Sequence, residues 1–138
     1  MILVIKVNEF ELHDEEFVRP VTDLLEDFKV VHYKDLKIDD LDVDKIIICG
    51  TALKDNFYLE HLDRFEFLKN YKGKVLGICA GTQIIGKVFG KELIKEKKIG
   101  VFDGKYYLHS FKVDVDNGYM FHPEVLNKEI ISRFAKNI

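Results

Sequence analysis

The segment that decides the fold is VLGICAGTQ, residues 75–83, in which an apolar strand leads into a helix at a cysteine between two glycines. This strand–turn–helix pattern is typical of α/β proteins that present a nucleophile at the edge of a sheet. Gly77 and Gly81 favour so tight a turn because it leaves no room for side chains beside the nucleophile. The amides and the positive dipole end of the following helix would then favour the thiolate of Cys79. A buried structural cysteine before an ordinary helix would have the same local pattern.

Strand and helix patterns alternate along the rest of the chain, without a linker or a repeat. The almost wholly apolar segment Lys45–Cys49 is typical of a strand buried on both faces of a parallel sheet. The periodicity predicts strands at residues 1–7, 30–33, 45–49 and 74–78, and helices at residues 17–28, 57–68, 80–90 and 126–138. We therefore expect one α/β domain over residues 1–138, with a doubly wound, mostly parallel, flavodoxin-like sheet. Ligands bind such folds at the carboxyl ends of the strands.

Between residues 97 and 121 the pattern shortens to hairpin-like segments. Asp103-Gly104 and Asn117-Gly118 have the composition of tight turns between antiparallel strands. The sequence thus predicts an antiparallel hairpin added to the parallel sheet.

A second motif lies near the C-terminus, where His122 is separated from Glu124 by one proline. Residues two apart in extended chain point to the same face, and Pro123 restricts His122 to extended geometry. His122 could therefore accept the proton of Cys79, while Glu124 fixes the tautomer of the imidazole and stabilises its protonated form. The order Cys, His, carboxylate predicts a catalytic triad.

These two motifs resemble those of the class I (triad) glutamine amidotransferases. The glutaminase domains of that family carry a Gly-Ile/Leu-Cys-x-Gly-x-Gln elbow and a Phe-His-Pro-Glu segment, which read here GICAGTQ (residues 77–83) and FHPE (residues 121–124). The resemblance implies that Cys79, His122 and Glu124 hydrolyse the side-chain amide of L-glutamine and supply the ammonia to a partner synthase. It implies no cofactor.

The same chemistry needs donors for the oxyanion, and the main-chain amide after the nucleophile, that of Ala80, is one candidate. By resemblance, the second donor comes from the loop after the third strand, Gly50-Thr51, where the family usually has two glycines. The resemblance also implies substrate contacts for Gln83 and for the main chain of the segment His109-Ser110-Phe111. The stretch between the elbow helix and His122 is short for this family, which predicts an incomplete pocket.

Composition narrows the class of protein further. A net charge of −3, with basic residues scattered along the 138-residue chain, argues against nucleic-acid binding. No apolar stretch is long enough to span a membrane, and the two cysteines without an export signal favour a reduced cytoplasmic setting. Lysines far outnumber arginines and Gln83 is the one glutamine, a bias common in proteins from hot environments.

Three alternatives remain open from the sequence. A metal site made of Cys79, His109, His122 and Glu124 is disfavoured, since His-Pro-Glu lacks the usual ligand spacings, and no metal is expected. A related cysteine hydrolase of the peptidase or deglycase type usually has histidine directly after the cysteine, where this chain has Ala80. A non-catalytic regulatory subunit would also fit the shortened pocket. The sequence specifies neither the acceptor nor the oligomeric state.

Overall fold

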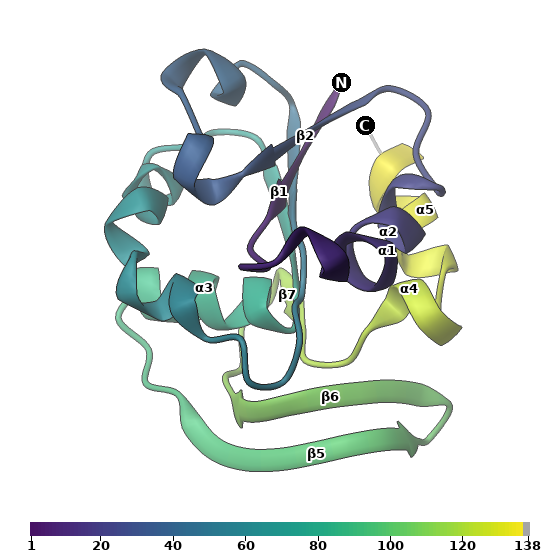
Figure 1. The fold of residues 1–138 in the computed structure, drawn as a ribbon. Coiled ribbons are helices and arrows are strands. Elements are labelled where there is room, and N and C mark those ends of the chain that lie inside the picture. The colour runs from purple at the N-terminus through teal and green to yellow at the C-terminus, as the bar shows by residue number, and fades with distance from the viewer. Residues whose placement is uncertain (137–138) are drawn as a thin grey trace.

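A computed structural model describes residues 1–136. Its centre is a sheet of five parallel strands in the order β2-β1-β3-β4-β7 (Figure 1). The strands are β1 (Ile2–Lys6), β2 (Phe28–His32), β3 (Lys45–Ile48), β4 (Lys74–Ile78) and β7 (Gly118–Tyr119). Ile48 is paired with Gly77, so β3 and β4 end side by side at the carboxyl edge of the sheet. The expected doubly wound, mostly parallel sheet is confirmed.

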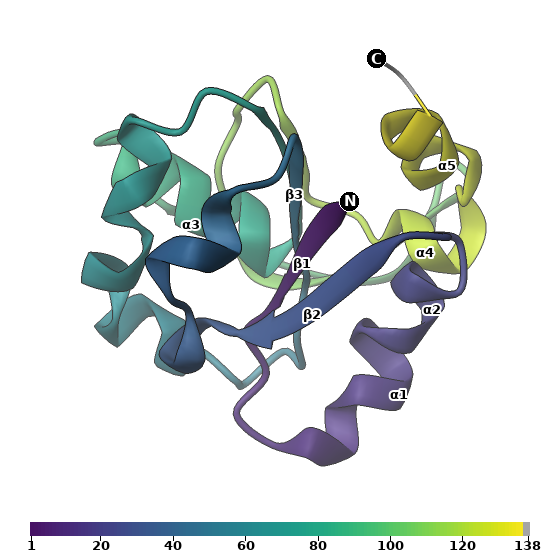
Figure 2. The same cartoon turned by 90° about the horizontal axis from the view of Figure 1, so that it is seen from above.

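Helices cover both faces of this sheet (Figures 1 and 2). On one face lie α1 (Asp14–Phe17), α2 (Arg19–Thr22), α4 (Pro123–Leu126) and α5 (Glu129–Lys136). On the other lie α3 (Ala80–Val88) and the 3-10 helices η2 (Tyr33–Asp35), η3 (Ile38–Leu41), η4 (Phe57–Glu60) and η5 (Leu62–Lys69); η1 (Glu11–His13) leads into α1. Successive residues of β1 alternate between the two faces, so Leu3 packs in the core beneath α3, and Val4 packs with Val21 and Ile131. The sheet is therefore buried on both sides.

A separate antiparallel hairpin consists of β5 (Ile94–Phe102) and β6 (Lys105–Lys112). Asp103 and Gly104 have positive φ angles of 51° and 74°, as a two-residue hairpin turn requires, so this predicted turn is confirmed. The hairpin crosses the lower end of the molecule in Figure 1, below α3, β7 and α4. It lies at the carboxyl edge of the sheet, where the elbow is.

The chain does turn at Asp116 and Asn117, but the hairpin predicted at Asn117-Gly118 is wrong. Gly118 begins β7, which runs parallel to β4 with Gly118 paired to Gly77. A Cβ atom on Gly118 would lie 2.7 Å from the side chain of Thr82, the third residue of α3. The glycine is thus needed because the strand approaches α3 closely, and no hairpin turn is made there.

Two predicted helices differ from those observed. The helix expected at residues 17–28 ends at Thr22, and Phe28 instead opens β2, where it is paired with Ile2. Residues 57–68 form the 3-10 helices η4 and η5 and no α-helix. The apolar residues Leu62, Phe65 and Leu68 recur every three residues, which matches the three residues per turn of a 3-10 helix.

The final helix, expected at residues 126–138, is also divided. Helix α4 ends at Leu126 because Asn127 leaves the helical region with φ −121° and ψ 49°. A second helix, α5, then runs from Glu129 to Lys136. Ile138, which was expected to line this helix, lies outside the described residues.

Candidate active site

Cys79 lies at a sharp turn between β4 and α3. Its φ of 48° and ψ of −98° form a conformation that residues with a side chain rarely adopt. A Cβ atom on Gly81 would lie 2.1 Å from the carbonyl oxygen of Ile48, and one on Gly77 would lie 2.8 Å from the amide nitrogen of Thr82. Both glycines are therefore required for β3, β4 and α3 to meet closely, as the sequence predicts.

His122 and Glu124 form a buried pair beside this turn. His122 is the extended residue before α4, and Pro123 and Glu124 are in the first turn of that helix. His122 Nδ1 lies 3.0 Å from Glu124 Oε2, and each side chain is 1% exposed. A carboxylate can only accept here, so Nδ1 carries the proton and Nε2 is left available for another partner.

Cys79 and His122 interact closely enough to alter the protonation of the imidazole. Burial lowers the pKa of His122, but the neighbouring Cys79 and Glu124 raise it, and the net shift is upward. The Sγ atom of Cys79 points to the main-chain oxygen of Leu108 in β6, at 3.2 Å. His122 Nε2 is buried and has no hydrogen-bond partner within residues 1–136. The thiol thus lies beside the imidazole, while its proton is directed to the hairpin.

The other cysteine, Cys49, is fully buried at the end of β3. Burial raises the pKa of the Cys49 thiol, and both cysteines are free. The environment of Cys49 therefore keeps it protonated, as expected for an inert core thiol.

The loop after β3 closes over the histidine. A Cβ atom on Gly50 would lie 2.7 Å from His122 Cε1, so only glycine permits this approach. The hydroxyl of Thr51 donates to Asp55 Oδ2 at 2.9 Å, and the amide of Glu9 donates to the same oxygen at 2.7 Å. Thr51 stands where the family usually has a second glycine. Its φ is not positive, so a residue with a side chain fits this position without backbone strain. The buried carboxylate of Asp55, which the sequence analysis missed, ties this loop to the segment after β1.

The four residues predicted to contact substrate lie on α3 and β6. Ser110 and Phe111 are half-buried in β6, and His109 is buried there, with its Nε2 3.1 Å from Glu96 Oε1 in β5. The side-chain amide of Gln83 contacts Tyr58 and the main chain of Phe111. The roles of these residues in substrate binding, and those of Gly50, Thr51 and Ala80 as oxyanion donors, stay predictions.

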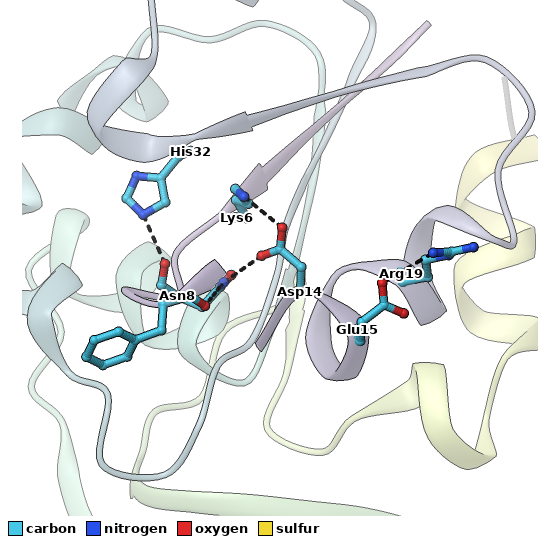
Figure 3. Close-up of polar contacts among 7 residues, drawn as sticks. Lys6, Asn8, Asp14, Glu15, Arg19 and His32 are labelled. Atoms are coloured by element: carbon cyan, nitrogen blue, oxygen red, sulfur yellow. Dashed lines mark hydrogen bonds and ion pairs between the residues drawn. The ribbon is translucent and has the colours of Figure 1, made fainter. Parts of the chain in front are cut away.

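Polar contacts at the end of β1 hold Asp14, the first residue of α1 (Figure 3). Asp14 accepts from Lys6 Nζ at 2.8 Å and from Asn8 Nδ2 at 2.7 Å. Burial raises the pKa of Asp14, but these two donors lower it, and the net shift is downward. The charged Asp14 begins α1, and Phe17 at the end of this helix packs against the His122 ring with 5.7 Å between centroids.

Residues 1–136 contain no group of three or more His, Cys, Asp or Glu side chains placed to hold a metal ion. Over the same residues, none of the helices is both long enough and apolar enough to cross a membrane.

Three comparisons with known proteins each found a similar protein or family. The family model described as "Glutamine amidotransferase class-I" matches residues 14–118. A probable cobyric acid synthase of Methanocaldococcus jannaschii is 37% identical in an alignment 87 residues long, which covers 54% of this chain and 18% of that protein. The structure of a putative GMP synthase subunit from Thermoplasma acidophilum superposes with a TM-score of 0.72 at 20% identity, covering 98% of this chain and 92% of the other.

The chain thus spans less than a fifth of the curated relative that it matches, and the solved structure is similar in fold. The family model covers most of the chain, including the elbow with Cys79. This protein belongs to the class I glutamine amidotransferase family.

Proposed function

We propose that this chain hydrolyses the side-chain amide of L-glutamine through Cys79, His122 and Glu124. The observation that carries the proposal is the buried His122–Glu124 pair, with its 3.0 Å hydrogen bond, beside a cysteine held at the N-terminus of α3. In a glutamine amidotransferase, a cysteine in this position has the geometry of an activated nucleophile.

The reaction follows from these positions. The Cys79 thiolate attacks the carboxamide carbon, and main-chain amides near Gly50 and Ala80 hold the oxyanion. The protonated His122 gives its proton to the departing nitrogen, which leaves as ammonia and leaves a γ-glutamyl thioester on Cys79. His122 then removes a proton from water, which opens the thioester to glutamate and restores the cysteine. Glu124 keeps the imidazole oriented and stabilises its positive form in both steps.

The ammonia would pass to a partner synthase, in the cytoplasm. Two similar proteins support this step by their names, a probable cobyric acid synthase and a putative GMP synthase subunit. Neither name identifies the acceptor used by this chain.

The closed state of the site favours dependence on that partner. Cys79 is 3% exposed, and β6 covers its sulfur. We expect the isolated chain to be a poor glutaminase, with KM raised more than kcat is lowered because β6 limits access to Cys79, and to improve when a bound synthase completes the site. Steady-state kinetics on the purified chain decide this: saturation at low glutamine with brisk turnover would contradict it. The peptidase or deglycase alternative has less support, because Ala80 follows the cysteine.

The deciding experiment is a glutamate-release assay on the wild type, His122→Ala and a matched His61→Ala variant, with and without synthases encoded by neighbouring genes. His61 packs against Tyr33 on the far side of the sheet from α1 and α4. We expect His122→Ala to lose nearly all turnover, since both proton transfers need the base, and His61→Ala to keep it. Equal rates for His122→Ala and wild type would exclude the triad, and no turnover under any condition would support a non-catalytic subunit.

A further inference from the structure

Tyr58 is a buried residue of η4 that belongs to neither motif. Its hydroxyl donates to Gln83 Oε1 at 2.6 Å, and Gln83 lies in α3, one turn after Cys79. The other end of the same amide, Gln83 Nε2, donates to the main-chain oxygen of Phe111 in β6 at 3.0 Å. Because the Phe111 oxygen can only accept, Nε2 faces β6, and Oε1 is left to accept from the Tyr58 hydroxyl.

Strand β6 crosses the site and is held there by main-chain oxygens. The oxygen of Leu108 accepts from Cys79 Sγ at 3.2 Å, and the oxygen of Tyr106 accepts from the His122 amide at 2.6 Å. The oxygen of Phe111 accepts from Gln83. Cys79, Gln83 and His122, which belong to the two sequence motifs, therefore all donate to β6. Of these three donors, the Gln83 amide is also hydrogen-bonded to a residue outside the motifs, Tyr58.

We infer that Tyr58 is a positioning residue, which acts through Gln83 to fix the position of β6. In this position the main chain of β6 covers Cys79 and can also bind glutamine. The part that concerns glutamine rests on the proposed function, since residues 109–111 are its expected contact. The part that concerns Cys79 rests on the observed contact with Leu108 alone.

Removing the hydroxyl has two opposite consequences. Gln83 Oε1 is left buried without its donor, so the amide loses one of its two anchors and holds Phe111 less firmly. A small reagent that needs no recognition then reaches Cys79 faster, because β6 no longer holds its carbonyl over the sulfur. Glutamine binds more weakly, because the same main chain is displaced. A general loss of stability would also expose Cys79 and weaken glutamine binding, so a control variant with a similar loss of stability is needed to separate the two explanations.

Tyr58→Phe tests this, since it keeps the ring and removes only the hydroxyl. Tyr71→Phe is a matched control: the Tyr71 hydroxyl donates to the main-chain oxygen of Val43 at 2.6 Å, at the amino ends of β3 and β4. For Tyr58→Phe we expect iodoacetamide to alkylate Cys79 about 3- to 10-fold faster, measured by peptide mass mapping. We also expect KM for glutamine to rise about 3- to 10-fold, with kcat within about 2-fold, as for loss of one buried neutral hydrogen bond.

Tyr71→Phe should change neither quantity, although both variants should be slightly less stable in a thermal melt. Gln83→Glu keeps the acceptor for Tyr58 and loses the donor to Phe111, so it should show the same rise in the alkylation rate; its KM is not compared, since Gln83 is itself an expected substrate contact. An alkylation rate of Tyr58→Phe equal to the wild type, or an unchanged KM, would overturn the inference. If the wild type does not turn over glutamine, the glutamine part fails with the proposed function. The alkylation rates still decide whether Tyr58 holds β6.

Discussion

Replacing Glu124 with glutamine is the sharpest test of the proposed triad, because it keeps the shape of the side chain and removes its charge. The carboxylate accepts from His122 Nδ1 at 3.0 Å, and both side chains are almost fully buried. The other oxygen, Glu124 Oε1, is buried without a hydrogen-bond partner in residues 1–136. The charge of Glu124 therefore acts mainly on the imidazole.

The size of the effect follows from this hydrogen bond. A buried hydrogen bond to a charged group contributes about 1.5–3 kcal/mol. If that contribution is lost when His122 becomes positive in the transition state, the rate falls by about 10- to 150-fold. We expect glutamate release by Glu124→Gln to be reduced to this extent but measurable, whereas His122→Ala loses nearly all of it.

The pH dependence has a definite sign. Glu124 is one of the groups that raise the pKa of His122, so Glu124→Gln lowers this pKa. A raised pKa in the folded state contributes stability that is fully present below the unfolded value of about 6.5 and is lost as the pH rises through the folded value. The stability deficit of Glu124→Gln, measured by urea unfolding, should thus be larger at about pH 6 than at about pH 9.

The assay is glutamate release across this pH range for wild type, Glu124→Gln and the control Glu66→Gln, which removes an exposed pair with Lys69. The control should change the rate by less than about 2-fold, as expected for a surface ion pair. If Glu124→Gln had the wild-type rate and the wild-type pH profile, Glu124 would have no role in orienting His122, and the triad would be wrong.

Three further predictions concern the elbow and its neighbours. An electrophilic glutamine analogue should label Cys79 and leave Cys49 unlabelled, because burial raises the pKa of the Cys49 thiol; peptide mapping that finds Cys49 labelled first would contradict this. Gly81→Ala should destabilise the protein by about 1–3 kcal/mol in urea unfolding, because the added methyl group meets the main chain of β3 at 2.1 Å; an unchanged midpoint would show that the elbow can relax. Thr51→Val removes the donor to buried Asp55, so stability should fall by about 1–3 kcal/mol and turnover should fall with it; full activity would mean that this hydrogen bond does not position the loop.

Local patterns in the sequence were sufficient for much of the fold and for the family. Alternation of apolar segments predicts the parallel sheet, because strands buried on both faces must be apolar along their length. The two glycines around Cys79 predict the elbow, and the proline between His122 and Glu124 predicts that they lie side by side, because both effects act within a few residues. These predictions agree with the structure, although the catalytic roles still need the experiments above.

Tertiary contacts decided what local patterns could not. Gly118 looks like a turn residue, and only its approach to Thr82 in α3 shows why it is a glycine within a parallel strand. The expected helices at residues 17–28 and 126–138 end early or divide, since sheet pairing and the position of Asn127 override their apolar periodicity.

The position of β6 over the site also depends on tertiary contacts between residues far apart in the sequence. Leu108 lies 29 residues after the cysteine that it covers, and Tyr58 lies 25 residues before the glutamine to which it donates. Periodicity reports which face of an element is buried, but it carries no information on which distant element packs there. The sequence alone thus determined the elbow, the His122–Glu124 motif and the sheet, while only the folded chain decided what lies over the nucleophile.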